Sequence, residues 1–363
     1  GFRFPALLVF LGSVLYWAIG RFNTRAPKYM TRKRIKALEP RIDISRAAAG
    51  LEYSDCYLHD NDARFVFNFV RNAMNYGAIA ANYVALSEAR REHGVWTVTA
   101  KDQIDGAAIT IRAKAMVNAT GAYADQFNSQ VAQRSEHRHV FSKGVHLIVD
   151  KLVSSKRILA FFASDGRLFF VIPMGAKTCI GTTDTRVDTP HADITADDRQ
   201  FVLDNINALM DLPQPITAAD IIAERCGVRP LAVKGNSGEQ DWLALSRKHA
   251  IDLNQQDAYL SIYGGKLTDC LNVGEEVANA LKTCGLRLPY SQKPWYGEAP
   301  DAVRDEFFHQ AELMQLDAMT DERASEPLSQ RLWRRYGLNA IELLDQIRQD
   351  PRQAEILIQH SEY

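Results

Sequence analysis

Residues 258–281 have the sequence AYLSIYGGKLTDCLNVGEEVANAL, which predicts a buried strand, a two-glycine turn and a helix in immediate succession. The first six residues alternate and are rich in tyrosine and isoleucine, as strands are. Gly264 and Gly265 remove two side chains at the turn, so that the backbone can approach a ligand closely. Thr268 or Asp269 can cap the helix, whose free N–H groups suit a phosphate or an electron-rich ring edge. An ordinary strand-to-helix turn without a ligand fits the pattern equally well.

The composition indicates a globular chain with a large core. The 363 residues are 46% hydrophobic and carry a net charge of −1. This length allows two or three lobes, and the charge gives no electrostatic argument for a nucleic-acid partner. The five cysteines lack metal-type spacing and favour buried thiols in a reducing compartment, so no metal site is predicted.

An apolar run followed by a basic run opens the chain. Residues 4–19 are almost entirely apolar, but this run of about 16 residues is shorter than the ~20 of a membrane-spanning helix. We therefore expect a helix of the core. Residues 25–41 carry seven Lys or Arg against a single Glu. Such a run is usually a solvated face, and beside an apolar helix it is also suited to anionic lipid.

The next part of the chain has the pattern of a nucleotide-binding α/β domain. Residues 60–76 predict a helix that ends at Gly77. Strands are expected over residues 78–86 and twice within residues 87–115. An apolar strand then ends on a small, glycine-containing loop at residues 119–122, as strands of such domains do.

Eight short segments together resemble the FAD-dependent glycerol-3-phosphate dehydrogenases and occur in the order of that family. They are EYSDC from residue 52, DAR from 62, VNATG from 117, KGVH from 143, FVIP from 170, GTTD from 181, GVRPL from 227 and GGKLT from 264. The resemblance implies an α/β chain, α+β overall, with D-amino-acid-oxidase-like architecture. It would contain an incomplete doubly wound FAD-binding domain, an antiparallel β-sheet substrate lobe and a C-terminal helical lobe.

The resemblance also implies a division of the chain into five parts. These are residues 1–53, a helical part of the substrate lobe; 54–122, the partial FAD-binding domain; 123–254, the antiparallel sheet lobe; 255–288, the return to the FAD-binding domain; and 289–363, a partial helical domain. The sequence contains no G-x-G-x-x-G and no acidic residue about 20 positions after one. We therefore expect a fragment that lacks this N-terminal motif and whose own activity is doubtful.

Lys143 and His146 belong to an alternating segment, VFSKGVHLIV, that predicts a strand. Spacing alone favours a solvated lysine and a hydrogen-bonded core histidine. The resemblance instead places His146 in the active site, and we assign Lys143 to substrate binding. The GTTD segment that starts at Gly181 is expected to be structural.

Arg229 lies in an apolar segment, CGVRPLAV, where a guanidinium requires an anionic partner. That partner is either a structural carboxylate or a substrate phosphate, which suits the planar guanidinium fork. The resemblance favours the phosphate and assigns a second phosphate contact to Arg247. Lys266, directly after the two glycines, is expected to reach toward flavin and substrate, and the predicted catalytic residues are His146, Arg229 and Lys266.

The resemblance implies FAD as the cofactor. The residues expected to bind it are Val84, Ala119, Thr120, Gly121, Gly264, Gly265, Lys266, Leu267 and Thr268. The implied reaction oxidises sn-glycerol 3-phosphate to dihydroxyacetone phosphate by hydride transfer to flavin N5, with electrons passed to a membrane quinone, or to oxygen in oxidase members. A cytoplasmic location, peripheral on the inner membrane, follows, with an anionic membrane surface and a homodimer as further candidate partners. Two alternatives are a flavin oxidase of amines or amino acids and a non-catalytic, membrane-associated fragment.

Overall fold

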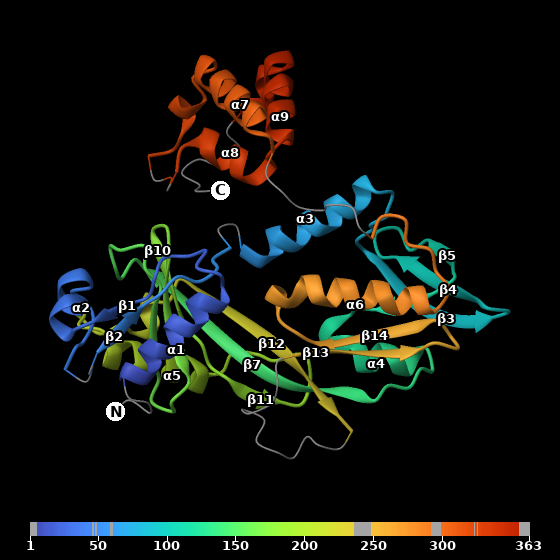
Figure 1. The fold of residues 1–363 in the computed structure, drawn as a ribbon, viewed down its shortest axis with the longest axis horizontal. Helices are drawn as coiled ribbons and strands as arrows, with labels where there is room; N and C mark the ends of the chain where they lie inside the picture. Colours follow the sequence, from blue (N-terminus) through green and yellow to red (C-terminus); the bar gives the residue numbers. More distant parts are fainter. Residues whose placement is uncertain are drawn as a thin grey trace.

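The computed structural model describes residues 6–45, 47, 49–58, 61–235, 248–291, 299–322, 324 and 326–355. These residues form an antiparallel sheet lobe, a smaller group of strands and helices beside it, and a lobe of helices near the C-terminus (Figure 1). The mixture of helices and sheets agrees with the predicted α/β class. The predicted domain boundaries stay predictions.

The first segment contains α1 (Ala6–Ile19), β1 (Lys28–Met30), α2 (Arg32–Leu38) and β2 (Gly50–Glu52). None of the 14 described residues of α1 is buried, and Leu7 and Ile19 are 67% and 73% exposed. The prediction of a core helix is therefore wrong. Apolar composition all round a helix calls for a covering surface, and the described part of the chain covers this helix only partly, for example where the Phe10 ring contacts Tyr29.

The antiparallel sheet is built around one long strand, β7 (His137–Asp150). β12 (Ala223–Lys234) pairs with one edge of β7, and β10 (Lys177–Gly181) and β11 (Thr185–Val187) pair with the other. β9 (Leu168–Met174) and β8 (Leu159–Phe162) extend the sheet beyond β10. The helix α5 (Ala196–Leu209) packs on one face of this sheet, so that Val202 and Ile206 share a core with Val145 and Leu147.

A second sheet carries the two-glycine turn. Its order is β13 (His249–Asn254), β14 (Tyr259–Gly264) and β6 (Met116–Asn118), with β6 and β14 parallel. The predicted succession of strand, turn and helix is confirmed, because β14 leads through the turn and one 3-10 turn into α6 (Cys270–Thr283). Within the described chain, Asp269 occupies the N-cap of α6 but its side chain makes no capping hydrogen bond. The short helix α4 (Ala124–Gln130) also contacts β14.

A third sheet consists of β3 (Val84–Glu92), β4 (Val95–Asp102) and β5 (Ala108–Ala113), and it follows the predicted helix α3 (Asn61–Asn75). The strand expected over residues 78–86 begins at Val84, six residues later. Tyr83 has a φ of +56°, which an extended strand does not allow, and pairing with Asp102 starts at the next residue. Trp96 of β4 joins this sheet to Tyr259 of β14.

The helices α7 (Asp301–Leu313), α8 (Leu328–Tyr336) and α9 (Asn339–Gln349) form the C-terminal helical lobe that the resemblance implied. They enclose a small core around Phe307 and Leu344. Arg64 of α3 donates to the carbonyl oxygen of Arg335 at 2.6 Å and so contacts this lobe. Across the described residues, every helix is too short or too polar to traverse a bilayer.

Candidate functional site

The two-glycine turn adopts a backbone that requires glycine. Gly264 and Gly265 have φ values of +60° and +89°, a region that L side chains rarely enter. A Cβ on Gly264 would lie 3.1 Å from the Cβ of Ala232 and 3.2 Å from the carbonyl oxygen of Lys248. Gly265, Lys266 and the following Thr268 are exposed, so the turn presents backbone on its outer side.

A second glycine segment lies at the same edge of the sheet. The parallel register pairs Ser261 of β14 with Asn118 of β6, so residues 119–121 leave β6 beside the end of β14. The buried Asn118 side chain accepts from the backbone N–H and the hydroxyl of Thr120, at 3.2 and 2.7 Å. Residues 119–121 are exposed. Two stretches of accessible backbone therefore meet at the carboxyl end of a parallel strand pair, where α/β sheets bind ligands.

Val84 lies on a different sheet from the other residues predicted to contact the cofactor. It begins β3 and pairs with Asp102. Arg247 lies outside the described residues.

The side chain of Arg229 reaches over Gly144 of the neighbouring strand β7. It pairs in register with Ser142, and a Cβ added at Gly144 would overlap both terminal nitrogens of the guanidinium. Nη2 donates to the hydroxyl of Thr182 at 3.3 Å, and Nη1 lies 3.8 Å from Oδ1 of Asp184. Asp184 also accepts from the Ser142 hydroxyl. Asp184 is thus a structural carboxylate partner, yet one third of the Arg229 side chain stays exposed.

His146 lies on the same face of β7 as Ser142 and Gly144, because alternate residues of a strand share a face. Burial, followed by the positive charges of Arg229 and Arg225, lowers the pKa of His146 to about 4. The imidazole is therefore neutral at physiological pH, and one of its ring nitrogens carries a lone pair that can accept a hydrogen bond.

Lys143 points to the opposite face of β7 and is not grouped with His146 and Arg229. Its Nζ lies 2.5 Å from Oδ2 of Asp198 and 3.1 Å from the carbonyl oxygen of Asp193, and both charged side chains are buried. Burial raises the pKa of the Asp198 carboxyl, but hydrogen bonds from Lys143 and Thr195 outweigh it and hold that pKa below its usual value. Lys143 is therefore committed to an internal ion pair that joins β7 to α5.

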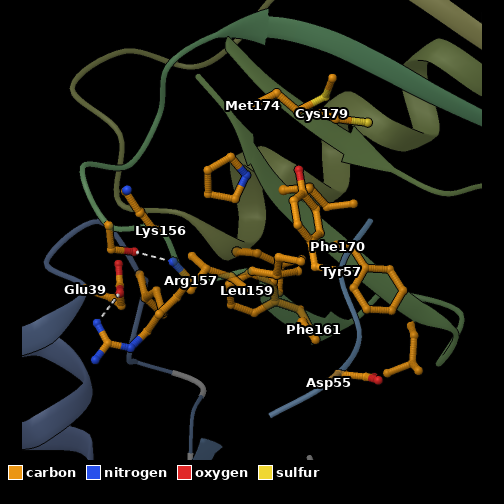
Figure 2. Close-up of a pocket in the computed structure, with 18 of the residues that line it drawn as sticks. Glu39, Asp55, Tyr57, Lys156, Arg157, Leu159, Phe161, Phe170, Met174 and Cys179 are labelled. Atoms are coloured by element: carbon orange, nitrogen blue, oxygen red, sulfur yellow. Dashed lines mark hydrogen bonds and ion pairs between the residues drawn. The ribbon is translucent and has the colours of Figure 1, made fainter. Parts of the chain in front are cut away.

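A large cavity of about 3250 Å³ lies over the antiparallel sheet. Figure 2 shows Tyr57, Phe161, Phe170 and Met174 around its apolar part, and the ion-paired Glu39 and Arg157 at its side. Strand register places two residues that line this cavity in the same cross-strand row as His146. Phe170, Gly181, His146 and Arg225 form one cross-strand row, and the two outer members, Phe170 and Arg225, both line the cavity.

The turn and Arg229 are neighbours along β12. Gly264 packs against Ala232 of β12, which lies three residues, or about 10 Å of strand, from Arg229. Figure 1 shows the link between β14 and α6 beside the middle of β12. Alternation directs Ala232 toward the turn and Arg229 toward Gly144, so the two side chains leave the strand in different directions.

Sequence reasoning missed two histidines beside the turn. His249 lies against Gly265. Its ring is between two carboxylates, with Nδ1 2.5 Å from Asp269 and Nε2 3.0 Å from Glu276. Burial lowers the pKa of His249, but the two carboxylates outweigh it and raise that pKa above its ordinary value. His139 lies on the other side of Gly264. Strand alternation marks both as inward-facing, but their partners are distant in sequence.

Comparison with known proteins places the chain in a family. Residues 14–247, more than half of the chain, match the family described as FAD dependent oxidoreductase, abbreviated DAO. The chain belongs to the DAO family of FAD-dependent oxidoreductases. This confirms the predicted superfamily and its cofactor class.

Relatives in the DAO family include dehydrogenases of phosphorylated polyols. Glycerol-3-phosphate dehydrogenase 2 of Mycobacterium tuberculosis is 34% identical over 257 residues, which cover 69% of this chain and 42% of the relative. D-erythritol 1-phosphate dehydrogenase of Brucella abortus is 30% identical over 303 residues, which cover 82% of this chain and 58% of the relative. The chain therefore spans about half the length of these relatives.

A solved structure supports the fold. Glycerol-3-phosphate dehydrogenase from Bacillus halodurans, in complex with FAD, superimposes with a TM-score of 0.68 over 90% of this chain and 66% of that protein, at 23% identity. This similarity shows that the chain has the fold of a DAO-family oxidoreductase.

The residues present fit the part of FAD that a DAO-family fold would hold here. Gly264 and Gly265 form a cradle that a Cβ would disrupt, and residues 119–121 add a second exposed backbone segment at the same edge. Residues 264–268 and 119–121 are the chain's own candidates for holding the cofactor.

Proposed function

We propose that the protein containing this chain uses FAD to oxidise sn-glycerol 3-phosphate to dihydroxyacetone phosphate. The proposal depends most on Arg229, whose partly exposed guanidinium lies on the same sheet face as a neutral histidine. The names of the relatives, which act on phosphorylated polyols, support the same substrate class.

In this proposal Arg229 binds the substrate phosphate. Thr182 and Asp184 contact the guanidinium, one third of the Arg229 side chain is exposed, and a planar guanidinium suits bidentate contact with phosphate oxygens. Gly144 is required because any side chain at that position would displace the guanidinium. Arg247 and Lys266 are proposed as further positive groups near the substrate.

When bound, FAD supplies the hydride acceptor at N5 and passes the electrons on, in this proposal to a quinone. The substrate hydroxyl must then lose a proton as the carbinol carbon loses hydride. His146 is neutral, so a ring nitrogen can accept a hydrogen bond from the substrate hydroxyl, and in this proposal it receives the proton as the hydride leaves. Lys266, exposed beside the turn, is the other candidate for contact with the hydroxyl.

We also propose that the protein works at a membrane surface on the cytoplasmic side. The exposed apolar side chains of α1 and the basic residues 25–41 that follow it support a peripheral contact with anionic lipid.

Anaerobic reduction of the bound flavin by candidate substrates tests the proposed reaction. In the complete protein with FAD, sn-glycerol 3-phosphate should bleach the flavin absorbance, and D-erythritol 1-phosphate should do so more slowly. Glycerol, which lacks the phosphate, should be slow at equal concentration. Bleaching by glycine or sarcosine but by neither phosphate would favour an amine or amino-acid oxidase. Failure to retain FAD would favour the non-catalytic alternative.

A further inference from the structure

His139 is a buried histidine in the first half of β7, and its side chain is inaccessible to solvent. Its Nε2 accepts a hydrogen bond from the backbone N–H of Gly264 at 3.3 Å. Its ring packs against the Tyr263 ring, with centroids 4.9 Å apart. The first glycine of the turn is therefore held by a side chain from the neighbouring sheet.

The same histidine is linked to the second glycine segment. The other ring nitrogen, Nδ1, makes no hydrogen bond within the described residues. That nitrogen lies 3.5 Å from Oδ2 of Asp125, which also accepts the backbone N–H of His139 at 2.9 Å. Asp125 lies in the first turn of α4, and only the 3-10 turn Gly121–Tyr123 and Ala124 separate it from residues 119–120.

We infer that His139 is a positioning residue that fixes the spacing between the two backbone segments proposed to hold FAD. The inference rests on the proposed FAD site. The Asp125 carboxylate holds the His139 backbone N–H, and the His139 ring holds the Gly264 N–H. A change at His139 should therefore loosen the turn and weaken the binding of FAD without touching the substrate-binding face of β7.

The chain offers a matched control in His137. It lies two residues earlier on the same face of β7, its Nδ1 is 2.7 Å from Asp252, and its ring centroid is 6.1 Å from that of Tyr263. His137 thus shares the strand, a carboxylate partner and the aromatic neighbour, whereas its hydrogen bonds go to Asp252.

Amide hydrogen exchange of residues 259–268, measured in the complete protein without FAD, tests the hydrogen bond directly. His139→Leu should speed exchange at Gly264 about fivefold, as expected for one lost hydrogen bond. His139→Gln should restore protection, because its amide oxygen can take the place of Nε2. His137→Leu should leave the exchange rate unchanged. Equal acceleration by His139→Leu and His137→Leu would overturn the inference.

The dissociation constant of FAD gives a second readout. His139→Leu should raise it about fivefold, and His139→Gln should bring it back near the wild-type value. If wild-type protein bound no FAD, the proposed function would be wrong. The exchange rates of the variants would still test whether His139 holds the Gly264 N–H. If wild type bound FAD and His139→Leu bound it equally well, the inference would fail alone.

If His139→Leu does not fold, Asp125→Ala tests the same link. Without the carboxylate the backbone N–H of His139 loses its acceptor and the ring is held less firmly, so exchange at Gly264 should rise. Unchanged exchange would contradict the inference.

Discussion

The two faces of β7 carry basic side chains with opposite uses. On one face Lys143 is buried against Asp198 of α5 and stabilises the packing of helix on sheet. On the other face His146 lies beside Arg229, and the surrounding positive charge and burial keep it neutral. The two residues are three positions apart in the sequence. Strand alternation places them on opposite faces, so Lys143 enters the packing against α5 while His146 lies on the face that we propose binds substrate.

The comparison also shows how glycine makes room for function. On the face with His146, Gly144 and Gly181 leave space for the Arg229 guanidinium and for the imidazole ring. On the other face, Val145 and Leu147 fill the space against α5. Glycines therefore leave room for Arg229 and His146 on the face proposed to bind substrate, whereas Val145 and Leu147 pack the opposite face against α5.

The largest expected effect comes from Lys143→Met. Removal of one partner leaves the Asp198 carboxylate buried without its cation, which should lower the free energy of unfolding by about 3–5 kcal/mol. Urea denaturation measures this loss. The KM for sn-glycerol 3-phosphate of the folded variant should stay at the wild-type value. A raised KM with unchanged stability would instead mean that Lys143 serves the substrate and not the fold.

The second effect is the pH dependence that His146 gives to stability. The folded-state pKa of about 4 lies below the ordinary value of about 6.5. As the pH falls from about 6.5 to 4, His146 therefore binds a proton in the unfolded chain but stays neutral in the folded chain. The contribution of His146 to stability should fall over this window by on the order of 2–3 kcal/mol and level off below it.

The variant His146→Gln isolates this contribution. Its free energy of unfolding relative to wild type should improve as the pH falls from 6.5 to 4, as urea denaturation at several pH values would show. A difference that stayed constant with pH would mean that His146 is not held neutral in the folded protein.

The smallest effect is expected from Gly144→Ala. The added methyl group pushes the end of a flexible arginine side chain, so stability should change little, but the displaced guanidinium should lower kcat/KM about tenfold. Steady-state kinetics measures the change. Gly227→Ala is the matched control, because Gly227 pairs directly with Gly144 and a Cβ there meets nothing within 4 Å among the described residues. Equal losses in the two variants would show that Gly144 has no special role.

Local patterns predicted the framework of the fold. The succession of strand, glycine turn and helix after Ala258 was clear because alternation, paired glycines and helical periodicity follow one another. The helix predicted over residues 60–76 was found as α3 because it has helical periodicity and ends at a glycine.

Contacts between distant segments were beyond the reach of these patterns. Asp198, the partner of Lys143, is 55 residues away, and Gly264, the partner of His139, is 125 residues away. The apolar helix α1 was misjudged because composition shows that a helix needs a cover but does not say what covers it. Thr182 and Asp184 were taken as structural, and they do serve structure by holding Arg229.

The phosphate preference of Arg229→Met tests the central claim most directly. In the complete protein, the ratio of kcat/KM for sn-glycerol 3-phosphate to that for glycerol should fall about hundredfold, because only the phosphorylated substrate loses a charge-assisted contact. The control Arg138→Met, on an exposed part of β7 whose side chain donates to the Gly235 carbonyl oxygen at 3.1 Å, should keep the wild-type ratio. An unchanged ratio in Arg229→Met would show that the phosphate is bound elsewhere.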